Sequence, residues 1–218
     1  MLGEYFEGDM RFAEGYDITS GVIGDRFRWP ENTVPYTIAA AFTEDERNII
    51  LGALEEISNK TCIHFVPHSN QRDYVAIVRG LPDSGCWSFV GRVYGAQILN
   101  LQPGPGPHCI FHGIAAHEMI HALGFYHEQS RTDRDDYVTI MWDNVTPGKE
   151  GNFIKYSSAQ VDPEGVAYDY GSIMHYGAYS FSQDASKPTI VPKTDVEIGQ
   201  RNGLSESDVQ KLRNMYKC

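Results

Sequence analysis

The segment that most constrains the fold of this 218-residue chain is His117–His127, which reads HEMIHALGFYH. Residues four apart on an α-helix lie on one face, so a helix here would point His117 and His121 the same way, one turn apart. Gly124 can adopt a positive φ at no steric cost, and it can thereby end the helix and return His127 toward the other two rings. The spacing therefore predicts three imidazole rings that converge on one point.

Three converging imidazoles suit a zinc ion, whose bonds to histidine nitrogen measure about 2.0–2.1 Å. Three neutral protein ligands leave one coordination position open, as in catalytic rather than structural zinc sites. Glu118 directly follows the first ligand, so its carboxylate can take a proton from a water molecule at the open position and later give it to a leaving amine. We therefore predict Glu118 as the catalytic base and one catalytic Zn²⁺ with three ligands, His117, His121 and His127.

The full pattern HExxHxxGxxH is more specific than HExxH alone, because the glycine and the third histidine must also fall at fixed offsets. It is the metzincin signature, which also includes a methionine-containing turn further along the chain. The segment Ser172–Tyr176, which reads SIMHY, fits that turn and predicts Met174 as an apolar floor beneath the metal. The remaining histidines lack the ligand spacing, and we expect structural or surface roles for His64, His68, His108, His112 and His175.

Charge and hydropathy argue against two broad classes of function. The chain has 29 acidic against 18 basic residues and a formal net charge of −11, and so acidic a surface repels phosphate backbones. No apolar run in the sequence approaches the roughly 18 residues that a membrane-spanning helix needs. We therefore expect neither nucleic-acid binding nor insertion into a membrane.

The cysteines favour an oxidising compartment. An even number suits two disulfides, and three connectivities are possible. The four cysteines are Cys62, Cys86, Cys109 and Cys218. Two N-glycosylation sequons begin at Asn59 and Asn144, and together with the cysteines they predict a secreted glycoprotein. The start, Met1–Glu4, has neither the basic residues nor the apolar stretch of a signal peptide, so we expect the sequence to begin after one.

Local patterns predict an α+β fold in which a helix packs on a twisted sheet. Thr43 followed by Glu46 is a capping-box signature, and apolar residues then recur at helical spacing. Further helices are predicted over about 110–123 and 205–216. Segments rich in β-formers and bounded by Pro, Asn and Gly predict strands over 34–40, 62–66, 74–78, 88–92 and 96–101.

The sequence resembles the astacin family of zinc endopeptidases over almost its whole length. The resemblance is carried by the metal-binding segment, by Glu128 directly after the third histidine, by the continuation QSRTDRD over 129–135, and by SIMHY over 172–176. It implies a two-lobed metzincin fold with the active-site cleft between the lobes. The N-lobe, about 21–127, would hold a twisted, mostly parallel sheet with helices, and the irregular C-lobe, about 128–218, would end in a helix.

The resemblance also implies roles for particular side chains. Tyr176 would be an additional metal ligand in the mature form, able to leave the metal and stabilise the oxyanion of the tetrahedral intermediate. The implied disulfides are Cys62–Cys218 and Cys86–Cys109.

Substrate-binding residues follow from the same resemblance. The strand 96–101 resembles the edge strand that pairs with an extended substrate, so Gln97 and Leu99 are predicted to contact the substrate. Arg201 matches the position that faces the residue just after the cleaved bond, where a guanidinium would favour acidic side chains.

The N-terminal arm, residues 1–20, carries five acidic residues against one arginine. Its segment Phe6–Asp9, FEGD, resembles the FxGD motif of astacin propeptides, in which the aspartate reaches the zinc and displaces the catalytic water. We therefore predict a propeptide segment over 1–20 and a catalytic domain over 21–218, with Asp9 as a metal ligand in the latent form. An activating protease would cut near Ser20–Gly21, and the new N-terminus would be buried beside Glu128.

Taken from its sequence, the chain is predicted to be a secreted zinc endopeptidase that acts on protein and peptide substrates, here in latent form. The alternative is a catalytically inactive, metal-stabilised module that captures peptides in the same cleft. The presence of Glu118 disfavours the alternative, because the catalytic base is the group most easily lost from an inactive relative.

Overall fold

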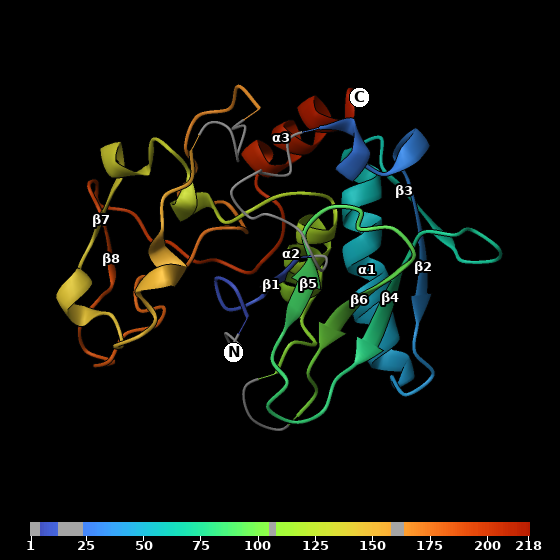
Figure 1. Ribbon diagram of the computed structural model, residues 1–218, viewed down its shortest axis with the longest axis horizontal. Coiled ribbons are helices and arrows are strands. Elements are labelled where there is room, and N and C mark those ends of the chain that lie inside the picture. The colour runs from blue at the N-terminus through green and yellow to red at the C-terminus, as the bar shows by residue number, and fades with distance from the viewer. Residues whose placement is uncertain (1–4, 13–23, 105–107, 158–163) are drawn as a thin grey trace.

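The chain is described from a computed structural model that covers residues 5–12, 24–104, 108–157 and 164–218. Figure 1 shows two sides: the main sheet with helices α1 and α2 on one, and irregular segments with strands β7 and β8 on the other. The segment that contains β1, in blue, lies between them (Figure 1). The predicted two-lobed α+β fold is confirmed, whereas the predicted cut at 20–21 lies outside the described residues.

The main sheet has six strands in the order β1-β5-β6-β4-β2-β3. All neighbouring pairs are parallel except β5–β6, which is antiparallel, so the predicted mostly parallel sheet is confirmed. The strands are β1 (Met10–Arg11), β2 (Thr33–Ile38), β3 (His64–Pro67), β4 (Tyr74–Arg79), β5 (Trp87–Phe89) and β6 (Ala96–Leu101). Strand β1 belongs to the N-terminal arm, which therefore extends the sheet by one strand.

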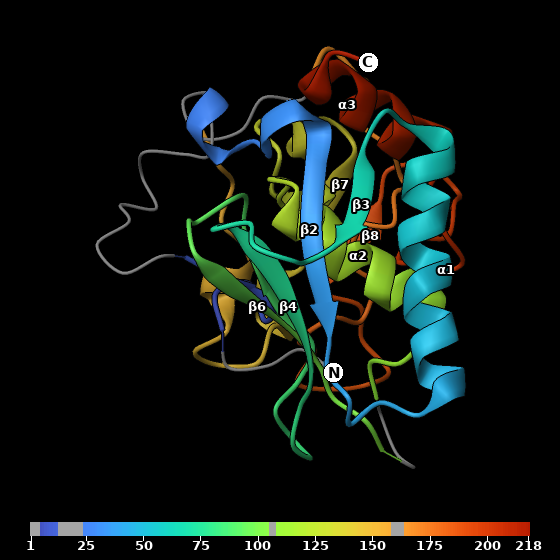
Figure 2. The same cartoon turned by 90° about the vertical axis from the view of Figure 1, so that its right-hand side faces the viewer.

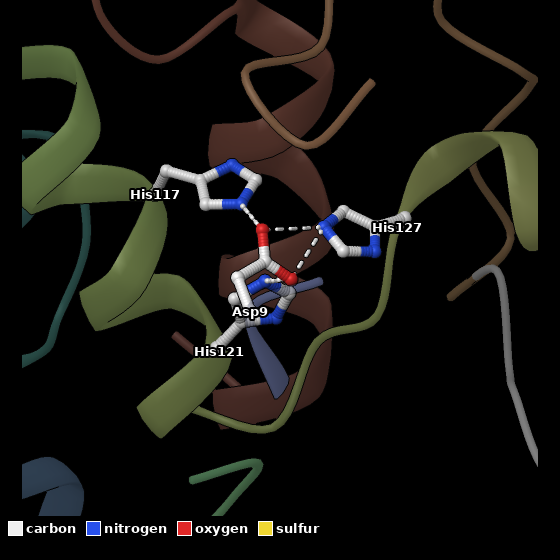
Figure 3. A group of neighbouring side chains, drawn as sticks. All are labelled: Asp9, His117, His121 and His127. Carbon is white, nitrogen blue, oxygen red and sulfur yellow. Dashed lines mark hydrogen bonds and ion pairs between the residues drawn. The ribbon is translucent and has the colours of Figure 1, made fainter. Parts of the chain in front are cut away.

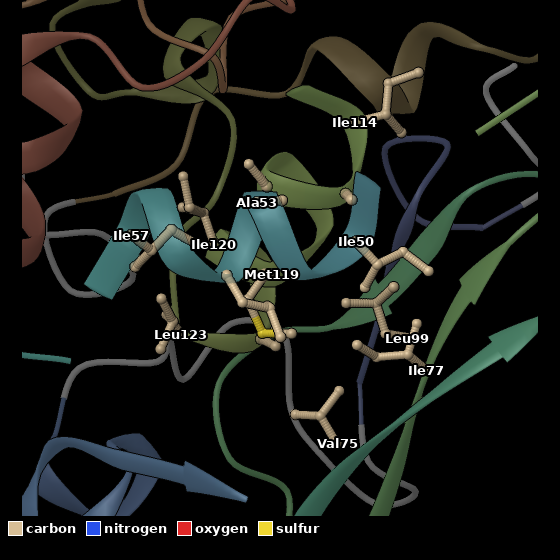
Figure 4. Close-up of a cluster of buried hydrophobic side chains, with 14 of the residues drawn as sticks. Ile50, Ala53, Ile57, Val75, Ile77, Leu99, Ile114, Met119, Ile120 and Leu123 are labelled. Carbon is tan, nitrogen blue, oxygen red and sulfur yellow. The ribbon is translucent and has the colours of Figure 1, made fainter. Parts of the chain in front are cut away.

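Helices α1 (Glu44–Lys60) and α2 (His112–Ala122) pack against each other and against the sheet, and Figure 2 shows both on the same side of it. Helix α1 begins with the predicted capping box, in which Thr43 and Glu46 each bond to the other's backbone. Its buried face meets α2 and the strands in the core shown in Figure 4. Helix α2 is buried along almost its whole length, and its residues are apolar or glycine except for His112, His117, Glu118 and His121.

The C-lobe has a second core and little regular structure. Strands β7 (Val138–Ile140) and β8 (Ile190–Pro192) form an antiparallel pair, and α3 (Glu206–Tyr216) begins with a capping box formed by Ser205 and Asp208. The short 3₁₀ helices of the C-lobe are η4 (Glu128–Ser130), η5 (Arg134–Asp136), η6 (Trp142–Asn144) and η7 (Glu150–Phe153), and two more, η2 (Asp25–Phe27) and η3 (Pro30–Asn32), precede β2 in the N-lobe. Within the described ranges, no helix is long and apolar enough to cross a bilayer.

Two disulfides join distant parts of the chain. Cys62, just before β3, is bonded to Cys218 at the end of the chain, across a separation of 156 residues. Cys86, just before β5, is bonded to Cys109, which precedes α2. These are the pairs that the resemblance to astacins implies, and the second one ties the strand beside the N-terminal arm to the helix that carries the first two histidines.

The predicted substrate-binding strand is wrong. Strand β6 lies inside the sheet between β5 and β4, and it is β5 that pairs with the arm. Gln97 and Leu99 are each 1% exposed and are not available to a substrate. Gln97 instead holds the following loop, since its amide donates to the carbonyl of Gly91 at 2.9 Å and accepts from the backbone nitrogen of Val93 at 3.1 Å. A six-residue strand predicted as an edge is thus a central one, because strand order depends on distant pairings.

Candidate metal centre

The three histidines of the signature converge as their spacing predicts. Helix α2 places His117 and His121 one turn apart, with ring centroids separated by 4.7 Å. Gly124 follows at φ 112°, and the chain then turns so that the ring of His127 lies 5.3 Å from that of His117 and 4.8 Å from that of His121. The glycine is required because an L-residue with a side chain rarely adopts this φ.

Asp9 of the N-terminal arm enters the space between the three rings, as Figure 3 shows. Its Oδ2 lies 3.3 Å from Nε2 of His117 and 3.3 Å from Nε2 of His127, and its Oδ1 lies 3.6 Å from Nε2 of His121. Ligand atoms about 2.0–2.1 Å from a tetrahedral ion are about 3.3–3.4 Å from one another. The distances from the Asp9 oxygens to the three ring nitrogens are therefore close to those expected between zinc ligands, and one ligand atom from each of the four residues lies within 4.8 Å of the others.

Unsatisfied polar atoms point to the same conclusion. Within the described residues, Asp9 Oδ1 and His121 Nε2 are buried and make no hydrogen bond. A buried polar atom without a partner costs free energy, and two such atoms facing one point are expected where a cation binds. The residues present thus fit a single metal ion, and three imidazoles with one carboxylate are a donor set that suits zinc.

The outer nitrogen of each ring has its own hydrogen-bond acceptor. His117 Nδ1 donates to the carbonyl of Ile173 at 2.8 Å, and His121 Nδ1 donates to the carbonyl of Phe125 at 2.7 Å. His127 Nδ1 donates to Oε2 of Glu7 at 2.7 Å. Each bond leaves Nε2 as the atom that faces the metal position, which is the arrangement that metal-binding histidines require.

In the metal-free site, the protonation states of Asp9 and His127 depend on each other. Burial opposes ionisation of both Asp9 and His127, but their mutual attraction outweighs it: the pKa of Asp9 is held well below its usual range, and the pKa of His127 is raised to about 9. Burial lowers the pKa of His117 to about 3. Without metal, the site therefore holds an ionised Asp9 next to a protonated His127.

Glu118 is buried beside the histidines and carries a perturbed carboxyl group. Burial raises its pKa well above the ordinary value, and the negative charge of Asp9 raises it further. Its Oε2 makes no hydrogen bond within the described residues. A carboxyl group with a raised pKa and a free oxygen at a metal site has the properties of a general acid and base.

The N-terminal arm also forms a hydrogen bond with Tyr176. Its hydroxyl donates a short hydrogen bond to the backbone carbonyl of Glu7, and its ring lies 4.5 Å from that of His127. Burial, with the negative charge of Asp9 next in size, raises the pKa of Tyr176 well above its usual value. In this form of the chain Tyr176 is therefore a neutral hydrogen-bond donor held by the arm. Met174 is buried in the main core with its carbonyl accepting from Glu128, and its place beneath the metal stays a prediction.

A cavity of about 250 Å³ extends beside the metal position. Its wall includes Glu118, Tyr176 and Arg201. The guanidinium of Arg201 donates to the carbonyls of His175 at 3.0 Å and Gln200 at 2.7 Å. The Arg201 side chain is part-buried at the cavity wall. The predicted substrate-binding arginine is thus close to the site, and its role stays a prediction.

Glu128 directly follows His127 in the chain and lies in a buried network of charges. Its Oε2 accepts from Lys211 of α3 at 2.5 Å, and its Oε1 accepts from Arg131 at 3.3 Å and from the backbone nitrogen of Asp169 at 2.9 Å. Burial nevertheless raises the pKa of Glu128, so the two cations do not fully compensate its desolvation.

Sequence reasoning missed Glu7, Ser130 and Lys211. Glu7 stands at the variable position of the FxGD motif, so the motif gave it no weight. Ser130 follows His127 by three residues, but no sequence pattern assigned a role to its hydroxyl, and Lys211 lies on α3, which only the fold brings to Glu128. In an extended chain Glu7 and Asp9, two residues apart, would point to the same side, so nothing in the sequence indicated that they contact His127 from two sides; the turn at Glu7 and Gly8 makes this possible.

Comparisons with known proteins agree with this geometry. Residues 22–217 match the family model described as Astacin, a family of peptidases. The zinc metalloproteinase nas-15 of Caenorhabditis elegans is 46% identical over 192 residues, which cover 87% of this chain and 32% of that protein. Meprin A subunit beta of Homo sapiens is 43% identical over 219 residues, covering 99% of this chain and 30% of that protein. The chain thus spans about a third of the length of these relatives.

A solved structure resembles the fold closely. High choriolytic enzyme 1, a hatching enzyme zinc-protease from Oryzias latipes, superposes with a TM-score of 0.80 at 38% sequence identity. The match covers 88% of this chain and 93% of that one. The similarity therefore includes both lobes and the cleft between them.

Proposed function

Since the chain belongs to the astacin family of zinc metalloendopeptidases, we propose that it is a secreted endopeptidase that cleaves protein and peptide substrates, held here in a latent form by its own N-terminal arm. The observation that carries the proposal is the position of Asp9 among the three histidines. A carboxylate at this position excludes both the attacking water and the substrate carbonyl. The two disulfides support secretion, because such bonds persist in oxidising compartments.

When bound, zinc supplies a Lewis acid that polarises the carbonyl of the bond to be cleaved. Once Asp9 has left, Glu118 is placed to take a proton from the attacking water and to deliver it to the leaving amine. Glu118 is buried beside the metal position, and its Oε2 makes no hydrogen bond among the described residues, so this oxygen is available for both transfers. Tyr176, released from the carbonyl of Glu7, can turn its hydroxyl toward the developing oxyanion.

Activation would require removal of the arm by another protease. The cut near Ser20–Gly21 is a proposal that rests on the resemblance alone. The environment of Glu128 supports burial of a new ammonium group near it, because its pKa is raised even with Lys211 and Arg131 in contact. A third positive group beside this carboxylate would be favourable.

The proposal is tested by comparing the intact chain with a chain that starts at Gly21, each loaded with zinc. The shorter chain should cleave a denatured protein, and a zinc chelator should abolish the cleavage. Asp9→Ala in the intact chain should raise basal cleavage, while Asp25→Ala, an exposed acidic residue outside the site, serves as the matched control. Absence of bound zinc, or an inactive shorter chain that is folded and loaded, would refute the proposed function.

A further inference from the structure

The three metal-facing histidines differ in where their outer hydrogen bonds come from. The acceptors for His117 and His121 are backbone carbonyls of Ile173 and Phe125, which remain after any cut in the arm. Among the described residues, the acceptor for His127 Nδ1 is the side chain of Glu7, which leaves with the arm. We propose that Glu7 is a positioning residue of the metal site, which fixes His127 from its outer side so that the latent chain holds zinc more tightly than the activated one. This inference rests on the proposed function and extends it to metal retention.

The side chain of Glu7 is held in place by burial and by hydrogen bonds to both carboxylate oxygens. The residue is 0% exposed, and both of its carboxylate oxygens are used. Oε2 accepts from His127 Nδ1 at 2.7 Å, and Oε1 accepts from the hydroxyl of Ser130 at 2.7 Å. A buried carboxylate is costly unless it is paired and hydrogen-bonded, so a glutamate placed here without a function in binding would be unfavourable.

The backbone of Glu7 is strained in order to reach this position. Its φ is 45°, in the left-handed region that residues with a side chain rarely adopt, and Gly8 follows at φ 81°. The turn is closed by a hydrogen bond from Gly8 N to the carbonyl of Tyr5 at 2.8 Å. The consequence is that Glu7 and Asp9 approach the same imidazole from two sides: Glu7 at Nδ1 and Asp9 at Nε2, where its Oδ1 lies 3.2 Å away. Strain sustained by side-chain contacts on both sides marks a functional constraint.

The physical effect on the metal follows from the hydrogen bond. A carboxylate that accepts from Nδ1–H fixes the tautomer with its lone pair on Nε2, orients the ring, and makes Nε2 a stronger donor to a metal. Loss of such an outer partner typically costs 10- to 100-fold in metal affinity. The carbonyl acceptors of the other two histidines are neutral, so His127 is the ligand that gains most from the arm.

The experiment measures zinc release from the intact chain into an excess of a chromogenic chelator. Glu7→Ala should accelerate release about 10- to 100-fold, and Glu7→Gln, which keeps an acceptor oxygen but loses the charge, should fall between it and the wild type. Ser130→Ala should have a smaller effect in the same direction. Glu150→Gln, a substitution on the exposed surface, is the matched control and should release zinc at the wild-type rate.

A second readout separates positioning of His127 from a general loosening of the arm. In the zinc-loaded chain the Nδ1 proton of His127 should give a strongly downfield NMR resonance that moves in Glu7→Gln, while the corresponding protons of His117 and His121 keep their shifts. Zinc release at the wild-type rate from both Glu7 variants, or equal acceleration in Glu150→Gln, would overturn the inference. The proposed function would survive that result, since it fails only if the chain binds no zinc or the arm-free chain does not cleave protein.

Discussion

At the scale of single residues, Glu118 is the group whose chemistry is most directly testable. Its carboxyl group is buried next to the metal position but contributes no ligand atom to the histidine and aspartate group. In the chain that starts at Gly21, Glu118→Gln should therefore keep its zinc and lose about 10²- to 10⁴-fold in kcat, the usual contribution of general acid–base catalysis. Metal content and kcat measured on the same sample decide the matter, and undiminished turnover would remove Glu118 from the reaction.

Arg201 gives a prediction about selectivity. Its guanidinium lies at the wall of the cavity beside the metal position, so it can pair with a carboxylate on the substrate. Arg201→Ala should lower kcat/KM about 10- to 100-fold for peptides with Asp or Glu just after the cleaved bond, and should leave peptides with Leu there little changed. Arg201→Lys should retain part of the preference. A uniform loss for both kinds of peptide would assign Arg201 a structural role.

The residues that sequence could and could not predict differ in a physical way. His117, His121 and His127 are linked by helix geometry and one glycine, so their convergence follows from local rules. Glu7 reaches His127 across 120 positions of sequence, and its contact depends on how the arm docks between the lobes. Gln97 was misassigned for the same reason: whether a strand is central or at an edge is decided by its neighbours, not by its own residues.

At the scale of secondary-structure elements, the position of α2 depends on a glycine. A Cβ atom on Gly113 would lie 1.8 Å from the carbonyl oxygen of Arg201, which means that the segment bearing Arg201 rests directly on the helix. Gly113→Ala should therefore destabilise the protein by about 1–3 kcal/mol and shift the cavity wall. Urea unfolding measures the first effect, and altered selectivity for acidic substrates measures the second.

Helix α1 provides the matched control. A Cβ atom on Gly52 would come no closer than 3.5 Å to its nearest neighbour, the ring of His112, so the site has room. Gly52→Ala should stabilise the chain by about 0.5–1 kcal/mol, because alanine favours a helix over glycine. If Gly113→Ala and Gly52→Ala changed stability in the same direction, the contact between Gly113 and Arg201 would not be what fixes the position of α2.

Elements with strong local signals were predicted well. The capping boxes at Thr43 and Ser205 set the starts of α1 and α3, because each satisfies backbone groups within four residues of sequence. Strand β5 is shorter than predicted and ends at Phe89, since Gly91 turns the chain at φ 70°. Strand β1 was not predicted at all: two residues of the arm become a strand only because β5 offers them a partner.

At the scale of the whole molecule, the bond between Cys62 and Cys218 constrains almost three-quarters of the chain. On chain-entropy reasoning, a cross-link over 156 residues stabilises the folded state by about 5 kcal/mol. The double variant Cys62→Ser, Cys218→Ser should lower the free energy of unfolding by an amount of that order, measured by urea unfolding. A reductant should then destabilise the wild type more than the variant, and equal effects on both would show that the long loop is not what the bond restrains.

The dependence of stability on pH is also a property of the whole molecule, and it is clearest without metal, because metal binding removes protons from the ligands. Burial lowers the pKa of His117 to about 3, whereas an unfolded histidine titrates near 6.5. Between these values the unfolded chain binds a proton that the folded chain does not, so stability falls as pH decreases below about 6.5. Burial lowers the pKa of His121 in the same direction.

His127 makes stability depend on pH in the opposite direction to His117. Burial opposes its protonation, but Asp9 and Glu7 raise its pKa to about 9, so the stabilisation is fully present below about 6.5 and is lost as pH rises toward 9. Glu118, whose pKa burial raises, adds to the loss as pH rises. The chelator-treated chain should therefore have its highest unfolding temperature near pH 6.5, with slopes of up to about 1.4 kcal/mol per pH unit for each group. Asp9→Asn should flatten the alkaline side, because His127 then loses its main partner; a stability that kept rising from pH 6.5 to 8.5 in the wild type would contradict the coupling of Asp9 and His127.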